Sequence, residues 1–300
     1  MRAIDRVIFF LAIGAIACTG CQHEPSSEHG EVVQIGTTRA DLFGIPKEYR
    51  AMHPRLESLM GAPVVFRSQP SGEAIAEQMR QGEIEYGFFT AEEFATAGDV
   101  SQLRPVAMAT NTVGKTARKA HIVIKAGSHL KGIEDCKHKR FGFGKYKAVL
   151  TDRAARVALE EAGVSIGELL PEVVTPPPLG MEGRLYLGND VAKTMVADPT
   201  VNAGVIDEVR LAKMKETGGN FIAGPSKDQF TIVAETIEVP EMVVVAGPKA
   251  NPQLTEKLRQ YLLNDVRQDA RICKDMDISG FAAPKMDLYD GVRSVIERTK

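Results

Sequence analysis

Short apolar strands alternate with amphipathic helices from Val32 onward, and this rhythm constrains the fold more than any other feature of the chain. The helical pattern at 72–81 is typical, because Ser71 precedes it as an N-cap and Gly82 follows it as a stop signal. Strand-like runs recur between such helices, at 32–38, 63–68, 86–90 and 103–111. Parallel strands covered by helices produce this alternation, so we predict an α/β fold.

Two similar segments divide this series: "HIVIKAGSH" begins at His121 and "EMVVVAGPKAN" begins at Glu241. A second series of strands and helices lies between them. We therefore predict two lobes, with two parallel-rich sheets joined by two crossing strands. The first lobe comprises 32–121 and the return segment 242–300, and the second comprises 122–241. We expect a ligand cleft between the lobes and a hinge in the crossing strands, at 122–125 and 242–246.

The first twenty residues have the features of a signal peptide. The apolar run "VIFFLAIGAIA" is shorter than the roughly 20 residues that a membrane-spanning helix needs. Small residues before a cysteine resemble a bacterial lipobox, with Cys21 as the expected lipidated residue and Cys18 as the alternative. The polar residues 21–31 then form a tether. We expect an exported protein, lipid-anchored at the periplasmic face of a membrane or at the cell surface.

Charge and motifs exclude several classes of function. The formal net charge is −2, so no basic excess indicates a nucleic-acid partner. The run "NTVGKT" (111–116) resembles a phosphate loop but lacks its first glycine and precedes a strand rather than a helix. The histidines show no metal-ligand spacing, and no serine lies in a nucleophile motif. We therefore predict no enzyme, no catalytic residue, no cofactor and no metal ion. Cys136 and Cys273 either pair or remain buried thiols.

Polar residues follow the strands of the first series. Because a ligand crevice lies at the carboxyl ends of parallel strands, we expect them at one site. These candidate ligand-binding residues are Thr37, Thr38, Ser68, Thr90 and Asn111. In the second series, "FGFGKYKAVLTDRAARVALEEAG" (141–163) combines a strand, a glycine turn and a helix, whose N-terminus is a potential anion site. Its candidates are Lys145, Tyr146 and Thr151.

Over most of its length, from about Val33 to Leu263, the chain resembles the phosphate, phosphite and phosphonate-binding periplasmic proteins of ABC importers. The stretches "HIVIKAGSHLKGIEDCKHKRFGFG", "NDVAKTMVADPTVNAGVIDEV" and "VPEMVVVAGPKANPQLTEKLRQYLL" carry this resemblance. It implies a two-lobed type II binding fold, a small anionic ligand and an ABC permease as partner.

The resemblance also implies specific site residues. The family's hydroxyl run, which holds phosphoryl oxygens, corresponds to residues 148–151, where only Thr151 keeps a hydroxyl. A histidine of the family corresponds to Asn189, and its aspartate after the next strand corresponds to Asp207. Asp152 places a carboxylate in the first turn, where an anion would bind. We therefore expect a divergent member whose ligand is a phosphonate-like, phosphate-like or other organic anion.

The leading hypothesis is a substrate-binding lipoprotein of an ABC importer. A receptor of the same fold that reports its ligand state to a membrane sensor kinase is the alternative. An enzyme on this fold is disfavoured by the export signal and by the lack of a cofactor motif.

Overall fold

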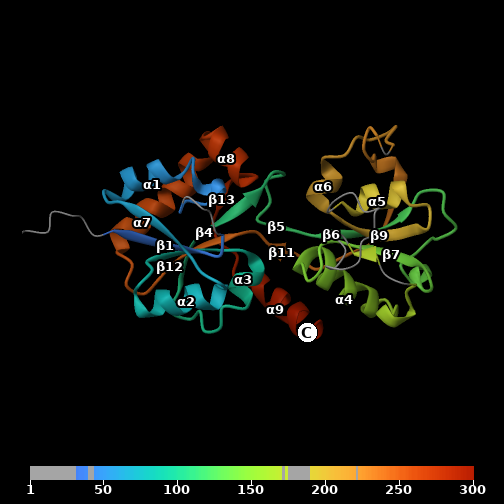
Figure 1. Cartoon of the computed structure of the whole chain (residues 1–300), viewed down its shortest axis with the longest axis horizontal. Coiled ribbons are helices and arrows are strands. Elements are labelled where there is room, and N and C mark those ends of the chain that lie inside the picture. Colours follow the sequence, from blue (N-terminus) through green and yellow to red (C-terminus); the bar gives the residue numbers. More distant parts are fainter. Residues whose placement is uncertain (1–31, 40–43, 171–172, 175–189, 221) are drawn as a thin grey trace, which may run out of the picture. The chain divides into compact units, whose positions relative to one another are not determined.

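The computed structural model describes residues 32–39, 44–170, 173–174, 190–220 and 222–300. The expected signal peptide, the tether and Cys21 therefore lie outside the described residues, as does Asn189. In the described part of the chain, two mixed β-sheets are joined by a short two-stranded ribbon (Figure 1). None of its helices is both long and apolar enough to cross a membrane.

The first sheet contains the strands that we expected in the first lobe. Its strands, in spatial order, are β13 (Ile278–Ala282), β4 (Arg104–Asn111), β12 (Val243–Ala246), β3 (Tyr86–Phe89), β1 (Val33–Thr37) and β2 (Val64–Ser68). Strand β1 runs parallel to β2 and β3, whereas β12 runs antiparallel to β3 and β4. The sheet is therefore mixed rather than parallel-rich, because the return strand enters it from the opposite direction.

Helices cover both faces of this sheet (Figure 1). One layer contains α1 (His53–Met60), α7 (Pro252–Gln260) and α8 (Ala270–Met276), and the other contains α2 (Gly72–Gln81), α3 (Ala91–Ala95) and α9 (Leu288–Arg298). Strand β12 serves both layers: Val244 packs in the first core and Val243 in the second. Alternate side chains of a strand point to opposite faces, so a continuous valine run fits a sheet that is buried on both sides.

The second sheet is organised in the same way. Its strands, in spatial order, are β10 (Phe230–Glu235), β6 (Ala120–Lys125), β9 (Val201–Asp207), β7 (Arg140–Phe143) and β8 (Val173–Val174). Helix α4 (Ala154–Glu161) packs on one face and α5 (Val191–Ala197) on the other. Strand β7 runs parallel to β8 and β9, but β6 runs antiparallel to β9 and β10. The parallel-rich prediction is again right only for part of the sheet.

The crossing segments lie beside the positions that we predicted. Strands β5 (Ala117–Arg118) and β11 (Val239–Pro240) pair antiparallel and connect the two sheets. Residues 122–125 lie inside β6, and 243–246 form β12 at the centre of the first sheet. The residues of both strands pair with a neighbouring strand on each side.

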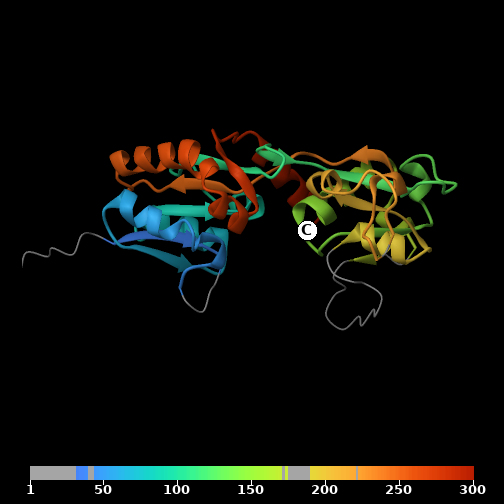
Figure 2. The ribbon, with the colours of Figure 1, turned by 90° about the horizontal axis from the view of Figure 1, so that it is seen from above.

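The C-terminal region differs from its prediction in one respect. The spacing by four of Leu254, Leu258, Leu262 and Val266 predicts one helix over 251–273. In the structure, α7 gives way to a π-helical turn at Tyr261–Asp265, and α8 begins after Asp269. The Asp269 carboxylate accepts hydrogen bonds from the N–H groups of Arg271 and Ile272, so it caps a new helix. The last helix, α9, ends beside α4, where Val295 packs against Val157 (Figures 1 and 2).

Candidate functional site

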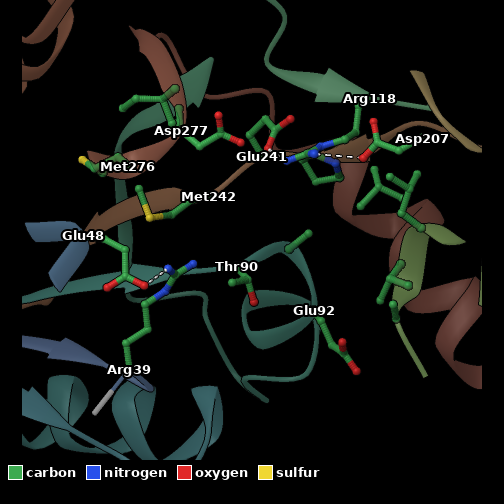
Figure 3. A pocket seen from close by; sticks show the side chains of 18 of the residues that line it. Arg39, Glu48, Thr90, Glu92, Arg118, Asp207, Glu241, Met242, Met276 and Asp277 are labelled. Atoms are coloured by element: carbon green, nitrogen blue, oxygen red, sulfur yellow. Dashed lines mark hydrogen bonds and ion pairs between the residues drawn. The ribbon is translucent and has the colours of Figure 1, made fainter. Parts of the chain in front are cut away.

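A cavity of about 720 Å³ is lined by residues from both sheet layers and from the ribbon that joins them (Figure 3). The first sheet and its helices contribute Arg39, Glu48, Thr90 and Glu92, together with Asp275 and Asp277 at the end of α8. The second contributes residues 148–151 and Asp207, and the ribbon contributes Arg118 and residues 239–241. The walls thus come from segments far apart in the sequence, as expected for a cleft between two lobes.

Three of the candidate ligand-binding residues meet at this cavity: Thr90, Thr151 and Asp207. Thr90 caps α3, where its hydroxyl oxygen accepts a hydrogen bond from the Glu93 N–H at 3.3 Å. Its own hydroxyl hydrogen can therefore be donated into the cavity. Asp207 ends β9 and caps α6 (Glu208–Ala212), accepting a hydrogen bond from the Val209 N–H at 2.7 Å.

The other described candidates do not line this cavity. Thr37 is buried and accepts a hydrogen bond from the Arg39 N–H. Ser68 is exposed at the end of β2, and Lys145 and Tyr146 are exposed in the turn after β7. The carboxyl ends of the strands do converge, but most of their polar residues bond locally instead of facing a ligand.

Asn111 has a structural role that the sequence did not reveal. It is only 2% exposed, and its amide oxygen accepts hydrogen bonds from the N–H groups of Val113 and Lys115. Its amide nitrogen donates to the Ala117 carbonyl. Asn111 therefore organises the "NTVGKT" turn, which is a connection between β4 and β5.

Two carboxylates of the chain occupy the donors that an anion could use. Glu93 accepts hydrogen bonds from the Thr38 hydroxyl and, at 2.7 Å, from the Thr90 N–H. Asp152 is 2% exposed and accepts from the Lys147 N–H at 2.6 Å and from Arg156 Nε at 2.5 Å. Each carboxylate lies at the start of a helix, where the backbone favours negative charge. These helix starts are therefore already neutralised from within.

Arg39 and Glu48 form an ion pair at the cavity wall. Arg39 Nη1 donates to Glu48 Oε1 at 2.6 Å, and the Arg39 side chain remains 42% exposed (Figure 3). A guanidinium has five N–H donors, so this bond leaves others for a ligand. Lys47, next to Glu48, also lines the cavity.

A second cluster joins the ribbon to the second sheet. Arg118 donates to Asp207 Oδ2 at 3.0 Å and to Glu241 Oε2 at 2.6 Å (Figure 3). Burial opposes the charge of Arg118, but its bonds to Glu241 and Asp207 outweigh that effect and raise its pKa. The other oxygen, Glu241 Oε1, is buried and has no hydrogen-bond partner among the residues that the structure describes.

The charge of the cavity limits what it can hold. Among the described residues that line it, three side chains are basic and six are acidic. Arg39 and Arg118 are already paired with carboxylates. Burial raises the pKa of Glu92, although Arg153 partly offsets this. The lining is therefore formally negative, which disfavours a ligand with more than one negative charge. No cluster of potential metal ligands occurs among the described residues.

Three lining residues with clear contacts were not expected from the sequence: Glu48, Arg118 and Glu241. Arg39 directly follows Thr38, so it belongs with the polar residues expected after the first strand. Arg118 and Glu241 are charged residues in the connecting ribbon, but their pairing over 123 positions could not be read from the sequence.

A protein-family model matches residues 45–289, and its description is the periplasmic substrate-binding protein of a phosphonate ABC transporter. None of the curated proteins matches the chain.

Solved structures share its fold at low sequence identity. XAC2383 from Xanthomonas citri, bound to ATP, is 14% identical with a TM-score of 0.61, covering 90% of this chain and 100% of the other. PhnD1 from Prochlorococcus marinus, in complex with methylphosphonate, is 14% identical with a TM-score of 0.58, covering 89% and 98%. A binding-protein component of an ABC phosphonate transporter from Pseudomonas aeruginosa is 14% identical with a TM-score of 0.54, covering 88% and 85%. These likenesses confirm the two-lobed binding-protein fold.

Proposed function

We propose that this chain, which belongs to the family of periplasmic substrate-binding proteins of phosphonate ABC transporters, captures a small oxyanion in the cavity and delivers it to an ABC permease. The family serves transport rather than catalysis. The ligand is a phosphonate-like, phosphate-like or other organic anion. Its recognition by the permease would require a change of state on binding, and the β5–β11 ribbon is where we propose that the lobes rotate.

One observation carries this proposal: both sheet layers and the ribbon line a single cavity that contains Arg39. We assign Arg39 as the main cation for the ligand, because it is partly exposed and keeps free donors. The hydroxyls of Thr90 and Thr151 add neutral hydrogen bonds from the two sides. Ala148, Val149 and Leu150 give the second wall an apolar surface suited to a carbon-bearing anion.

The proposal can be tested by thermal unfolding with phosphate, phosphite, methylphosphonate, methanesulfonate and small carboxylates. A ligand at 100 times its dissociation constant stabilises the native state by about 2.7 kcal/mol. We expect at least one of these anions to raise the melting temperature of the mature chain. Arg39→Gln should abolish that shift. The control Arg293→Gln changes an arginine of α9 that pairs with Asp290 outside the cavity, and it should retain the shift. If no oxyanion in the panel stabilised the chain, the proposal would be wrong.

We also propose that Cys21 carries a lipid anchor, with Cys18 as the alternative residue. The support is the sequence pattern alone: a short apolar run followed by small residues and a cysteine. In a bacterial host, metabolic labelling with palmitate and membrane fractionation should show labelled, membrane-bound protein. Cys21→Ala should release the chain from the membrane, whereas Cys18→Ala should not. Release by Cys18→Ala alone would move the anchor to that residue.

A further inference from the structure

The Glu241 carboxylate lies at the wall of the ligand cavity with one oxygen satisfied and one not. Oε2 accepts from Arg118 at 2.6 Å, while Oε1 is buried without a partner among the described residues. The side chain is only 9% exposed. A buried acceptor without a donor is costly, and such groups in native proteins usually have a specific role.

Among the residues that the structure describes, Arg118 is the one cation that pairs with the Glu241 carboxylate. Arg118 is shared with Asp207, and Asp277 at the end of α8 adds another carboxylate to the same cavity. On the remaining side, the Tyr289 hydroxyl of α9 donates to the Glu241 backbone carbonyl rather than to its carboxylate. Glu241 lines the cavity, so we infer that a bound ligand supplies the donor for Oε1.

We propose that Glu241 is a specificity-determining residue that accepts a hydrogen bond from the ligand, so the cavity selects singly charged oxyanions that carry an O–H group. This inference rests on the proposed function and refines it. A hydrogen phosphonate presents one negative charge to Arg39 and one hydroxyl to Glu241. A sulfonate has the same charge and shape but no hydroxyl. A fully ionised phosphonate has lost its hydroxyl and brings a second negative charge toward the carboxylates.

The loss of affinity for an analogue that lacks the hydroxyl can be large in such a site. A site built to bond a ligand hydroxyl rejects the analogue without it, because the site's own polar group is then left unpaired. A second bare charge is repelled more strongly in a poorly solvated cavity than in water. At Glu241, both effects favour a singly charged anion with a hydroxyl over an anion without one.

Isothermal titration of the mature chain with methylphosphonate and methanesulfonate tests this proposal. At about pH 5.5, where methylphosphonate keeps its hydroxyl, we expect it to bind at least about tenfold more tightly than methanesulfonate. At about pH 8.5 that advantage should disappear, because the second ionisation removes the hydroxyl.

Two variants separate the role of this oxygen from general charge effects. In Glu241→Gln, the amide oxygen faces Arg118 and its N–H₂ group takes the place of Oε1, so a donor replaces the acceptor. The preference should then fall below about twofold or reverse. The control Glu235→Gln removes a carboxylate that pairs with Lys119 outside the cavity and should keep the wild-type preference. Thermal unfolding of each variant shows whether it is folded.

The outcomes are distinguishable. Equal binding of both probes by the wild type, or tighter binding as the pH rises, would overturn the role of Glu241 and leave the proposed function intact. An unchanged preference in folded Glu241→Gln would do the same. If the wild type bound neither these probes nor any oxyanion at either pH, the proposed function would fall and this inference with it.

Discussion

Arg118 connects the ribbon to a carboxylate on each side, and its removal should destabilise the fold measurably. In Arg118→Met, Glu241 would lose its one hydrogen-bonded cation while remaining 9% exposed. Asp207 would lose an ion pair but keep its helix-capping bond to the Val209 N–H. The main cost therefore comes from Glu241, left as a buried carboxylate without a partner.

The expected loss in the free energy of unfolding follows from the two hydrogen bonds that Arg118 donates, to Glu241 and to Asp207. A hydrogen bond to a charged group contributes about 1.5–3 kcal/mol, so two of them give about 3–6 kcal/mol. The Arg118 side chain is 33% exposed, so solvent reduces this figure, and we expect a loss of about 2–4 kcal/mol. Urea unfolding monitored by circular dichroism should show the loss as a lower midpoint with an unchanged slope.

The double variant Arg118→Met/Glu241→Met provides the decisive comparison. Replacing both charged partners by apolar side chains of similar volume is often nearly neutral. We therefore expect the double variant to be more stable than Arg118→Met by about 1–2 kcal/mol. If the second substitution instead added its own destabilisation, the two residues would not be coupled, and the reasoning from a buried unpaired carboxylate would be refuted.

Three further predictions concern the core, the turn and the thiols. Val295→Ala removes two methyl groups at the junction of α9 and α4 and should cost about 1.6 kcal/mol or more in urea unfolding, whereas Val113→Ala, at a side chain 42% exposed, should stay within about 0.5 kcal/mol. Asn111→Ala should lower stability by about 2–3 kcal/mol without changing ligand affinity in calorimetry, because its bonds hold a turn. Burial, with Asp135 and Glu134 adding to it, raises the pKa of Cys136 to about 12, so iodoacetamide at about pH 8 should label this thiol only after unfolding; mass mapping of labelled native Cys136 would contradict this.

Local signals in the sequence predicted the elements whose boundaries depend on neighbouring residues. Helix α2 begins after Ser71 and ends before Gly82, as expected from a cap that accepts the Ala74 N–H and from a glycine with φ of 79°. The break after α7 was missed because Leu258, Leu262 and Val266 keep helical spacing across it, and all three are buried. The signal available in the sequence was Asp269, a residue type that often caps the start of a new helix.

Strand direction depended on information that local patterns do not contain. The unbroken apolar run of β12 indicates a strand that is buried on both faces, but it does not show which way the strand runs in the sheet. The direction follows from the return path of the chain through the β5–β11 ribbon, which brings β12 in antiparallel to β3. The resemblance to a two-lobed family correctly implied the crossing, and only the structure placed it at Arg118 rather than at 122–125.

The site was harder to predict than the fold, because its chemistry is decided by contacts between distant residues. Thr38 and Thr90 have the composition of an anion site, yet Glu93 already accepts hydrogen bonds from both. The pairing of Thr38 with Glu93 spans 55 positions and leaves no trace in either local sequence. Near the second helix start, Asp152 accepts hydrogen bonds from the Lys147 N–H and from Arg156 Nε.

These internal carboxylates change how the family resemblance bears on the ligand. Glu93 and Asp152 accept hydrogen bonds close to the starts of two helical segments, from the Thr90 N–H and the Lys147 N–H respectively. We propose that recognition depends chiefly on side chains elsewhere in the cavity, on Arg39 for the negative charge and on Glu241 for a hydroxyl. A ligand with two full negative charges would meet six acidic and three basic side chains in this cavity among the described residues. This excess of carboxylates repels an anion with two charges more than an anion with one, on grounds independent of the unpaired oxygen of Glu241.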